Sequence, residues 1–169
     1  MKLIEAMKEV KNLKIKSEDL RGKVKLYCSK ASIETNVYPD QTAQIKEWIQ
    51  SHTDTVKQIG KLSVAIQKTN IATEVEIEIG NKKVTHNIAE WIYRRRELAE
   101  LERQCWACLT DKGIKEGQIK QTDNSVYELK IVRFYDPVEK DKMVELYRTE
   151  PSLIDRTLET VNAVTEVVM

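Results

Sequence analysis

The chain has 169 residues, 41% of them hydrophobic and 33% charged, with a formal net charge of +1 at pH 7 and only five glycines and three prolines. This composition differs from that of disordered, collagen-like and membrane-spanning chains, and no apolar run reaches the 18 residues that suggest a transmembrane helix. The nearly balanced charge gives no general attraction to a nucleic-acid polymer or a membrane. The length suits a single domain, residues 1–169, with a substantial core.

Two features of the sequence bear on the compartment. The first eight residues, Met1–Lys8, include Glu5 inside what would have to be the apolar part of a signal peptide. The three cysteines follow no disulfide-framework spacing, which agrees with a reducing environment. We therefore expect a cytoplasmic protein.

The first half of the chain predicts two long helices. Apolar residues recur every three or four positions from Leu3 to Tyr27, with Ser17 as the exception, and form the stripe of an amphipathic helix. The period then breaks for about a dozen residues, which predicts a loop. The stripe restarts after Asp40, a suitable N-cap residue, and predicts a second helix that ends near Asn70.

Beyond the second helix the period of the pattern changes. Apolar residues alternate with glutamates along Glu74–Ile79, and the dipeptide Gly80-Asn81 separates this run from Lys82–Thr85. An alternating run followed by such a dipeptide is typical of a β-hairpin. We expect its glutamates to face solvent.

The next segments predict a third helix and an arm. Asn87 and Glu90 have the spacing of a capping box, and an apolar stripe follows until Gly113. The run Val126–Phe134 is rich in β-forming residues and predicts part of a second hairpin or a long arm.

The last segment predicts a fourth helix and a short strand. Asp136 followed by Pro137 is a strong helix start, and the helix should run to about Asn162 with a kink or a break at Pro151. The alternating residues from Val164 to the end predict a short strand.

The ends of the second and fourth helices resemble each other. Residues 66–75 and 158–167 share Asn, Thr, Glu and Val at a constant offset of 92. At the same offset Ile59-Gly60 aligns with Pro151-Ser152. Because glycine and proline are poor helix formers, we expect a kink in both helices. The alternative is a chance match between two amphipathic helices.

A repeat covering about residues 1–79 and 84–168 would give two related helical hairpins. The predicted fold class is therefore mainly α, a pseudo-symmetric antiparallel four-helix bundle built from two helical hairpins, with short β-hairpins or strands at the ends.

Four short motifs carry a resemblance to a known family. They are Met1–Ala6, Thr69-Asn70 with Thr73, Arg94–Leu98, and Leu158–Thr165. In these motifs the chain resembles the septicolysin-like family of small, largely uncharacterised helical proteins, in chain order and over nearly its whole length.

The chain also departs from the pattern of that family. The family favours Asp where Glu97 stands, Trp where Ala163 stands, and Arg or Asp near Lys11-Asn12. The family name implies a thiol-activated cytolysin, but no segment of this sequence has the character of a pore-forming element. The resemblance therefore implies a fold and not an activity.

The residues that most often carry catalysis form no constellation here. Cys105 and Cys108 are a C-x-x-C pair near the end of the third predicted helix, where the helix dipole disfavours thiolates, and we interpret them as small side chains on a core stripe. His52 falls on an apolar stripe, which favours a core or interface histidine. Without a triad, a metal-ligand set or a glycine-rich phosphate loop, we expect no enzyme, no cofactor and no metal.

The third helix is the most suggestive segment. Arginines cluster there beside aromatic residues, and Arg95 falls on the apolar stripe, where an unpaired guanidinium would be costly. Arginine suits bidentate phosphate contacts, and Trp or Tyr suits stacking on a base. The candidate ligand-binding residues are Trp91, Tyr93, Arg94, Arg95, Arg103 and Asn70. The alternative is internal pairing with acids three or four residues away, such as Arg94 with Glu97 and Arg103 with Glu100.

These patterns lead to a function hypothesis with one main alternative. The hypothesis is a non-enzymatic homo-oligomeric protein that captures or sequesters a small anionic or nucleotide-like ligand, such as a nucleotide signal. Self-association is expected because the strands Val75–Ile79 and Val164–Met169 are edges that one chain would leave open, and because a chain with one Phe has a slender core. The alternative is a structural or protein-interaction module with its arginines in internal ion pairs.

Overall fold

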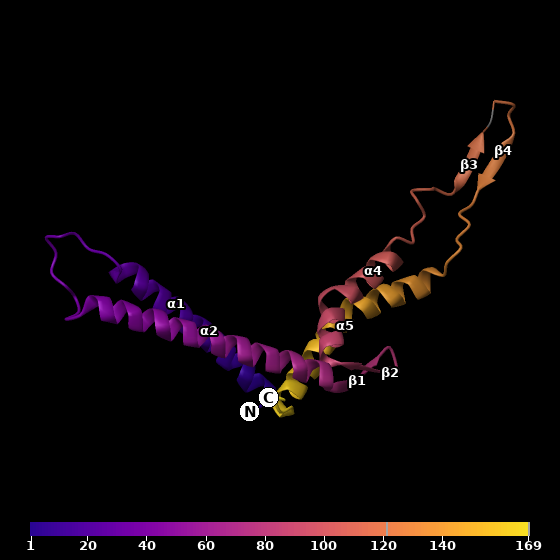
Figure 1. Ribbon diagram of the computed structural model, residues 1–169. Helices are drawn as coiled ribbons and strands as arrows, with labels where there is room; N and C mark the ends of the chain where they lie inside the picture. Colours follow the sequence, from indigo (N-terminus) through magenta and orange to yellow (C-terminus); the bar gives the residue numbers. More distant parts are fainter. Residues whose placement is uncertain (121, 169) are drawn as a thin grey trace. The chain divides into compact units, whose positions relative to one another are not determined.

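The computed structural model describes residues 1–120 and 122–168, and the chain divides into two compact units. The first unit comprises residues 1–75, 87–89 and 158–169, and the second comprises residues 76–86 and 90–157. The described part is mainly helical and has two small antiparallel strand pairs, β1–β2 and β3–β4 (Figure 1). This confirms the coarse fold class.

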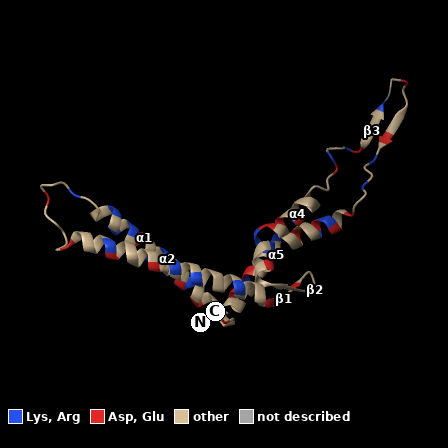
Figure 2. Ribbon diagram, in the orientation of Figure 1, with Lys and Arg blue, Asp and Glu red and all other residues tan. Residues whose placement is uncertain are grey.

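The first unit is built on a long helical hairpin. Helix α1 spans Leu3–Tyr27 and helix α2 spans Gln41–Ala72, and the two lie side by side (Figure 1). Both ranges agree with the sequence prediction. Asp40 caps α2 as expected, because its side chain accepts a hydrogen bond of 2.9 Å from the amide of Ala43. In Figure 2 the ribbon positions of Lys and Arg and those of Asp and Glu are interspersed along both helices.

The core of the hairpin includes Leu13 and Leu20 of the predicted stripe in α1, but the predicted stripe in α2 is partly wrong, because Ile49 and Val56 are about half exposed and Trp48 is buried instead. Leu13, Leu20 and Trp48 are buried, and the Trp48 ring packs against Tyr27 and Tyr38 with centroids 5.7 and 5.3 Å away. Tyr38 comes from the connecting loop, so the aromatic cluster holds that loop against the end of the hairpin.

Ser17, the polar residue in the first stripe, has a partner in the second. Its hydroxyl lies 3.0 Å from Nε2 of His52, and both residues are half-buried. Two polar residues on facing stripes therefore satisfy each other, as expected for a core histidine.

The end of the chain pairs with its beginning inside the first unit. The Leu3 amide donates to the Thr165 carbonyl at 2.8 Å, and the Val167 amide donates to the Met1 carbonyl at 3.0 Å. The predicted C-terminal strand is thus reduced to one antiparallel bridge between Lys2 and Glu166, which pairs one side of this segment with the N-terminus. Residue 169 lies outside the described part.

The first predicted β-hairpin is confirmed. Strand β1 spans Glu74–Ile79 and β2 spans Lys82–Asn87, and the turn residues Gly80 and Asn81 have φ values of 57° and 64°. Positive φ at both central residues is the geometry of a type I′ turn. Val75 and Ile77 are buried and the glutamates between them are exposed, as the alternation predicts. Strand β1 pairs with β2 on one side, and in this two-stranded sheet of the described residues its other edge has no strand partner.

One continuous helical stretch follows the hairpin. It consists of α3 (Ile88–Tyr93), a π-helical segment η1 (Arg94–Leu98) and α4 (Ala99–Ala107). The sequence predicts one helix as far as Gly113. The helix instead ends at Ala107, and Gly113, with a φ of 72°, lies in the turn beyond it.

The arm and the last helix as far as Thr157 complete the second unit. Strand β3 (Gly117–Lys120) pairs with β4 (Val126–Leu129), which is shorter than the predicted run, and helix α5 spans Pro137–Val164. The Val138 amide donates to the Asp136 side chain at 2.9 Å, which confirms the predicted helix start. Helix α5 continues through Pro151 without a break.

Two sequence predictions about the whole chain stay predictions, the internal repeat and the four-helix bundle. The order of a helix, a non-helical connection, a second helix and a short paired segment occurs twice, ending at β1 and at the Glu166 bridge. The internal repeat would produce this order, although the order does not require a repeat.

Candidate functional site

The predicted arginines lie on the helical stretch α3–η1–α4 of the second unit. Arg94 and Arg95 belong to η1, while Arg103 belongs to α4. A π-helical turn inserts an extra residue per turn and frequently accompanies functional sites. Here it presents Arg94 and Arg95 in succession to acids of α5.

Arg94 forms a bidentate ion pair with a buried acid. Its Nε bonds Oε1 of Glu150, and its Nη2 lies 3.1 Å from Oε2. The Glu150 side chain is fully buried, and that of Arg94 is 25% exposed. The hydrogen bond to Glu150 raises the pKa of Arg94. The guanidinium therefore neutralises a carboxylate that has no contact with water.

Arg95 and Arg103 also have carboxylate partners. Arg95 bonds Asp155 of α5, as its place on the apolar stripe requires. Arg103 bonds both oxygens of Glu100 at 2.7 and 2.6 Å, and this contact lowers the pKa of Glu100 to about 2. The predicted pair Arg103–Glu100 is confirmed, whereas Arg94 pairs with Glu150 and not with Glu97.

The remaining predicted residues differ in exposure and location. Trp91 is completely buried, with the His86 ring edge-on at 4.8 Å, while Tyr93 is 57% exposed. Asn70 is buried near the end of α2 and belongs to the first unit, whereas the arginines belong to the second. A base can stack only on an accessible ring, so the exposed Tyr93 is available for stacking and the buried Trp91 is not.

A cavity of about 700 Å³ opens beside Arg94 within the second unit. The β1–β2 hairpin supplies one wall, and six residues of α5 between Lys142 and Thr149 supply the other. The two walls touch at the turn, where a Cβ on Gly80 would lie 3.2 Å from Leu146. Ligand pockets commonly have volumes of roughly 300–1,000 Å³, so the cavity can hold a small molecule.

The cavity is lined by both apolar and basic residues. Val84, Met143 and Leu146 line it, together with Lys82 and Lys142. The acid in its wall, Glu145, is paired with Arg148 at 2.7 and 2.8 Å. The two lysines thus provide positive charge that no ion pair among the described residues neutralises.

Tyr147 and His86 complete the wall around Arg94. The Arg94 guanidinium carbon lies 6.0 Å from the centroid of the Tyr147 ring, and burial raises the pKa of the Tyr147 hydroxyl. His86 lies 3.4 Å from an oxygen of Glu90 through Nδ1. The wall therefore offers a neutral phenol and an imidazole beside a fixed cation, which are groups that can orient a polar ligand.

Sequence reasoning found Arg94 and missed the other residues of this site. Glu150 had a signal, because it is an acid within the apolar stripe Met143, Tyr147, Ile154 and Leu158 of α5. Lys82 and Lys142 had none. They are ordinary surface lysines in sequence and meet only because the hairpin packs on α5.

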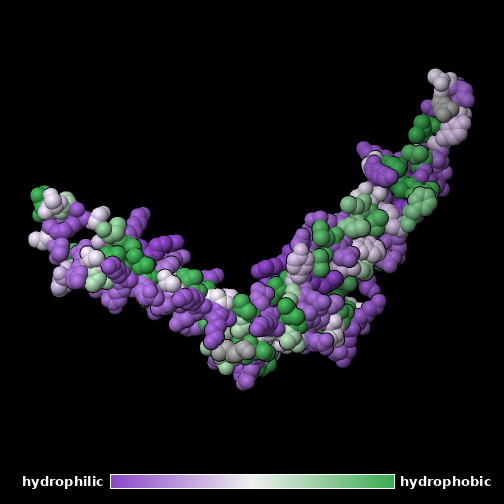
Figure 3. Space-filling model, in the orientation of Figure 1, coloured by the Kyte–Doolittle hydropathy of each residue, from purple (hydrophilic) through white to green (hydrophobic). Residues whose placement is uncertain are grey.

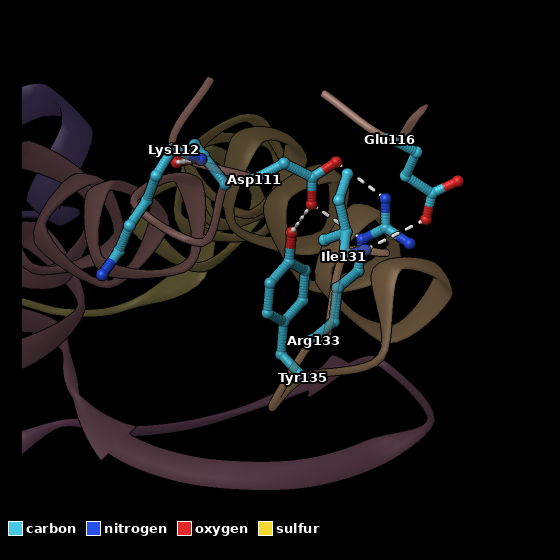
Figure 4. Close-up of polar contacts among 7 residues, drawn as sticks. Asp111, Lys112, Glu116, Ile131, Arg133 and Tyr135 are labelled. Atoms are coloured by element: carbon cyan, nitrogen blue, oxygen red, sulfur yellow. Dashed lines mark hydrogen bonds and ion pairs between the residues drawn. The ribbon is translucent and has the colours of Figure 1, made fainter. Parts of the chain in front are cut away.

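A second polar cluster lies at the base of the β3–β4 arm (Figure 4). Arg133 donates to both oxygens of Asp111 at 2.7 Å, and the Tyr135 hydroxyl donates to the same carboxylate at 3.3 Å. The Arg133 contact lowers the pKa of Asp111. The Ile131 amide donates to Glu116 at 3.1 Å. These contacts join the two sides of the arm, so we assign the cluster a structural role.

The cysteines are exposed, which corrects their interpretation as core residues. Cys105 lies within α4 and Cys108 directly follows its end, and both side chains are exposed. Within residues 1–120 and 122–168, no group of three or more His, Cys, Asp or Glu side chains is arranged to hold a metal ion. No helix among these residues is both long and apolar enough to cross a membrane.

The fold defines a class of mainly helical proteins with a long helical hairpin and two small strand pairs. No family model matches the chain, and no curated protein matches it. Among solved structures, it resembles the crystal structure of a functionally unknown conserved protein from Corynebacterium diphtheriae, with a TM-score of 0.59 and 18% sequence identity over 99% of both chains. This likeness shows a shared fold.

Proposed function

We propose that the protein is a non-enzymatic, homo-oligomeric binding protein of the cytoplasm that captures a small anionic ligand with an apolar or aromatic part, such as a nucleotide. The cavity beside Arg94 carries this proposal, since it has the volume of a ligand site and is lined by Lys82 and Lys142 together with apolar side chains. Its partners would be the ligand and further copies of the chain, and neither a nucleic-acid polymer nor a membrane.

In this proposal the arginines have different roles from those that the sequence predicts. Arg94 is held by Glu150 and orients one edge of the cavity, while the ammonium groups of Lys82 and Lys142 contact the anion. Arg95 and Arg103 support the helical stretch through their own acids. Tyr93, which is exposed, remains a candidate for stacking on an aromatic group.

One observation favours the alternative, a protein-interaction module. Arg94, Arg95 and Arg103 all have carboxylate partners, so none of them requires a ligand. Membership of the septicolysin-like family is part of either proposal and rests on the four short motifs. The predicted four-helix bundle is likewise proposed, as an assembly of helical hairpins.

The test is a thermal-shift screen against inorganic phosphate, mononucleotides, cyclic dinucleotides and ADP-ribose. A ligand present at 100 times its Kd should stabilise the fold by about 2.7 kcal/mol. We expect at least one nucleotide to raise the melting temperature, and we expect Lys82→Ala and Lys142→Ala to reduce this shift. Lys83→Ala is the matched control, since Lys83 is the next residue of the same strand and pairs with Glu76 at 3.0 Å.

Two results would decide against ligand capture. A screen without any shift, or a shift that the Lys83 variant reduces as much as the Lys82 variant does, would leave the cavity without a role. Either result favours the interaction module.

A further inference from the structure

Helix α2 carries a row of apolar residues that the described residues of the first unit leave about half exposed. We call Ile49, Val56, Val64 and Ile71 the α2 stripe, and their side chains are between 48% and 63% exposed. Steps of seven, eight and seven residues keep all four on one face of a helix. The core residues Trp48 and Thr55 lie on a different face. Figure 3 shows apolar residues emerging along the surface of the helical hairpin.

The α2 stripe is symmetric about its own centre. Its centre is Gly60, with Val56 and Val64 each four residues away and Ile49 and Ile71 each eleven residues away. A second α2 helix in antiparallel orientation would therefore place valine on valine, isoleucine on isoleucine and glycine on glycine. A two-fold symmetric interface has this property, because residue i meets residue j and j meets i.

No described part of a single copy packs closely on Gly60. A Cβ added there would meet nothing within 4 Å, and glycine inside a helix costs roughly 0.5–1 kcal/mol relative to alanine. At the centre of an antiparallel pair the missing side chain lets the two backbones approach closely. This gives the glycine a function that the single hairpin does not.

The available area suits a reversible dimer. The α2 stripe is about 33 Å long, given a rise of 1.5 Å per residue, and a contact one to two helices wide covers roughly 330–660 Å² on each copy. Stable interfaces bury about 800 Å² per partner. We therefore expect association at micromolar concentration and not below.

We propose that α2 packs against α2 of a second copy, antiparallel about a two-fold axis at Gly60. The helical hairpins of two copies then form an intermolecular four-helix assembly. This inference assigns a surface to the homo-oligomerisation in the proposed function, and it rests on that proposed function. It uses residues of the first unit only, so its failure and the failure of ligand capture in the second unit are separate outcomes.

The first experiment is sedimentation velocity on three chains at protein concentrations of roughly 2 to 200 μM. This range spans the micromolar association that we expect for an interface below standard size. The unsubstituted protein should be a dimer in the upper part of this range. Val56→Glu should be a monomer, because the introduced carboxylate would face Val64 of the partner subunit. Far-UV circular dichroism verifies that each variant is folded.

The third chain tests the antiparallel register by charge rescue. Adding Val64→Lys to Val56→Glu should restore the dimer, since the antiparallel pairing places an introduced lysine opposite each introduced glutamate. Positions 56 and 64 lie about 12 Å apart along one helix, so this rescue acts between copies.

The second experiment locates the axis by cross-linking. In a chain whose Cys28, Cys105 and Cys108 are replaced by Ser, Gly60→Cys should form an intermolecular disulfide readily under mild oxidation. Gln58→Cys, half a turn around α2, is the matched control and should cross-link poorly. The proposal is wrong if the unsubstituted protein is a monomer at the highest concentration, if Val56→Glu dimerises unchanged, or if both cysteines cross-link equally.

Discussion

Glu150 is the residue on which the second unit most depends. Its carboxylate has no exposure to water and receives two hydrogen bonds from Arg94. A buried charge loses its hydration, so its partner must compensate closely. The neighbouring pair Arg95–Asp155 is different, because the Asp155 side chain is 59% exposed.

Glu150→Gln should therefore destabilise the protein far more than Asp155→Asn. We expect a loss of about 2–3 kcal/mol for the first, below the roughly 3–5 kcal/mol of fully buried pairs because Arg94 keeps some solvent contact. The second should change stability by less than about 1 kcal/mol. Urea unfolding followed by circular dichroism measures both values. Equal losses would contradict the assignment of Arg94–Glu150 as the buried pair.

Individual residues show what periodicity can and cannot predict. The place of Arg95 on an apolar stripe predicts an acid partner, and the residue has one. The same reasoning places Cys105 and Cys108 in the core, but both are exposed, because a stripe does not reveal which part of a helix another element covers. Lys82 and Lys142 come together through tertiary packing, which a local pattern does not report.

Among the elements, the helical hairpin was the most predictable. Its stripes, its loop and the Asp40 cap are local signals, and they give α1 and α2 to within a few residues. The π-helical segment η1 has no such signal in the sequence. A π-helical turn is intrinsically rare, and here it accompanies two arginines that bond acids of another helix.

The β1–β2 turn is the element that closes the cavity, and Gly80 is its most constrained position. Gly80→Ala should be destabilising for two reasons, the positive φ of 57° and the contact of a Cβ with Leu146 at 3.2 Å. Gly113→Ala is the control. Gly113 has a φ of 72° but nothing within 4 Å of its Cβ.

We expect Gly113→Ala to cost about 1–2 kcal/mol, which is the cost of the backbone conformation alone. Gly80→Ala should cost more, and it should also weaken binding of any ligand that the cavity takes. Thermal unfolding compares the two variants. If Gly80→Ala is the milder of the two, the turn does not pack against α5 as described.

At the scale of the whole molecule, the two ends of the chain stabilise the same unit. Besides the bonds to Met1 and Leu3, the Val168 amide donates to the Thr69 hydroxyl at 2.9 Å. That hydroxyl is buried and itself donates to the Ala65 carbonyl at 2.8 Å. The last described residues therefore pack at the open end of the helical hairpin, opposite the loop that joins α1 and α2.

Ending the chain at Val164 should loosen the first unit. The hydrogen bonds that residues 165–168 make with Met1, Leu3 and Thr69 would be lost, each with a net contribution of about 0.5–1.5 kcal/mol. Hydrogen exchange should show faster exchange at Leu3 and through the last turns of α2, with the arm of the second unit unchanged.

The control for this truncation is Glu166→Ala. The Glu166 side chain is 75% exposed and bonds only Lys2 among the described residues, so its loss leaves the backbone pairing in place. Unchanged exchange at Leu3 in the truncated chain would contradict the role of the C-terminal residues.

The discontinuity of the first unit has a consequence for synthesis on the ribosome. Helices α1 and α2 emerge early, but residues 158–168, which belong to the same unit, emerge only after the entire second unit. A nascent chain must therefore keep an incomplete hairpin, with its apolar α2 stripe exposed, while residues 76–157 are made. During translation the second unit can therefore be completed first. The N-terminal residues are the last to reach their final partners.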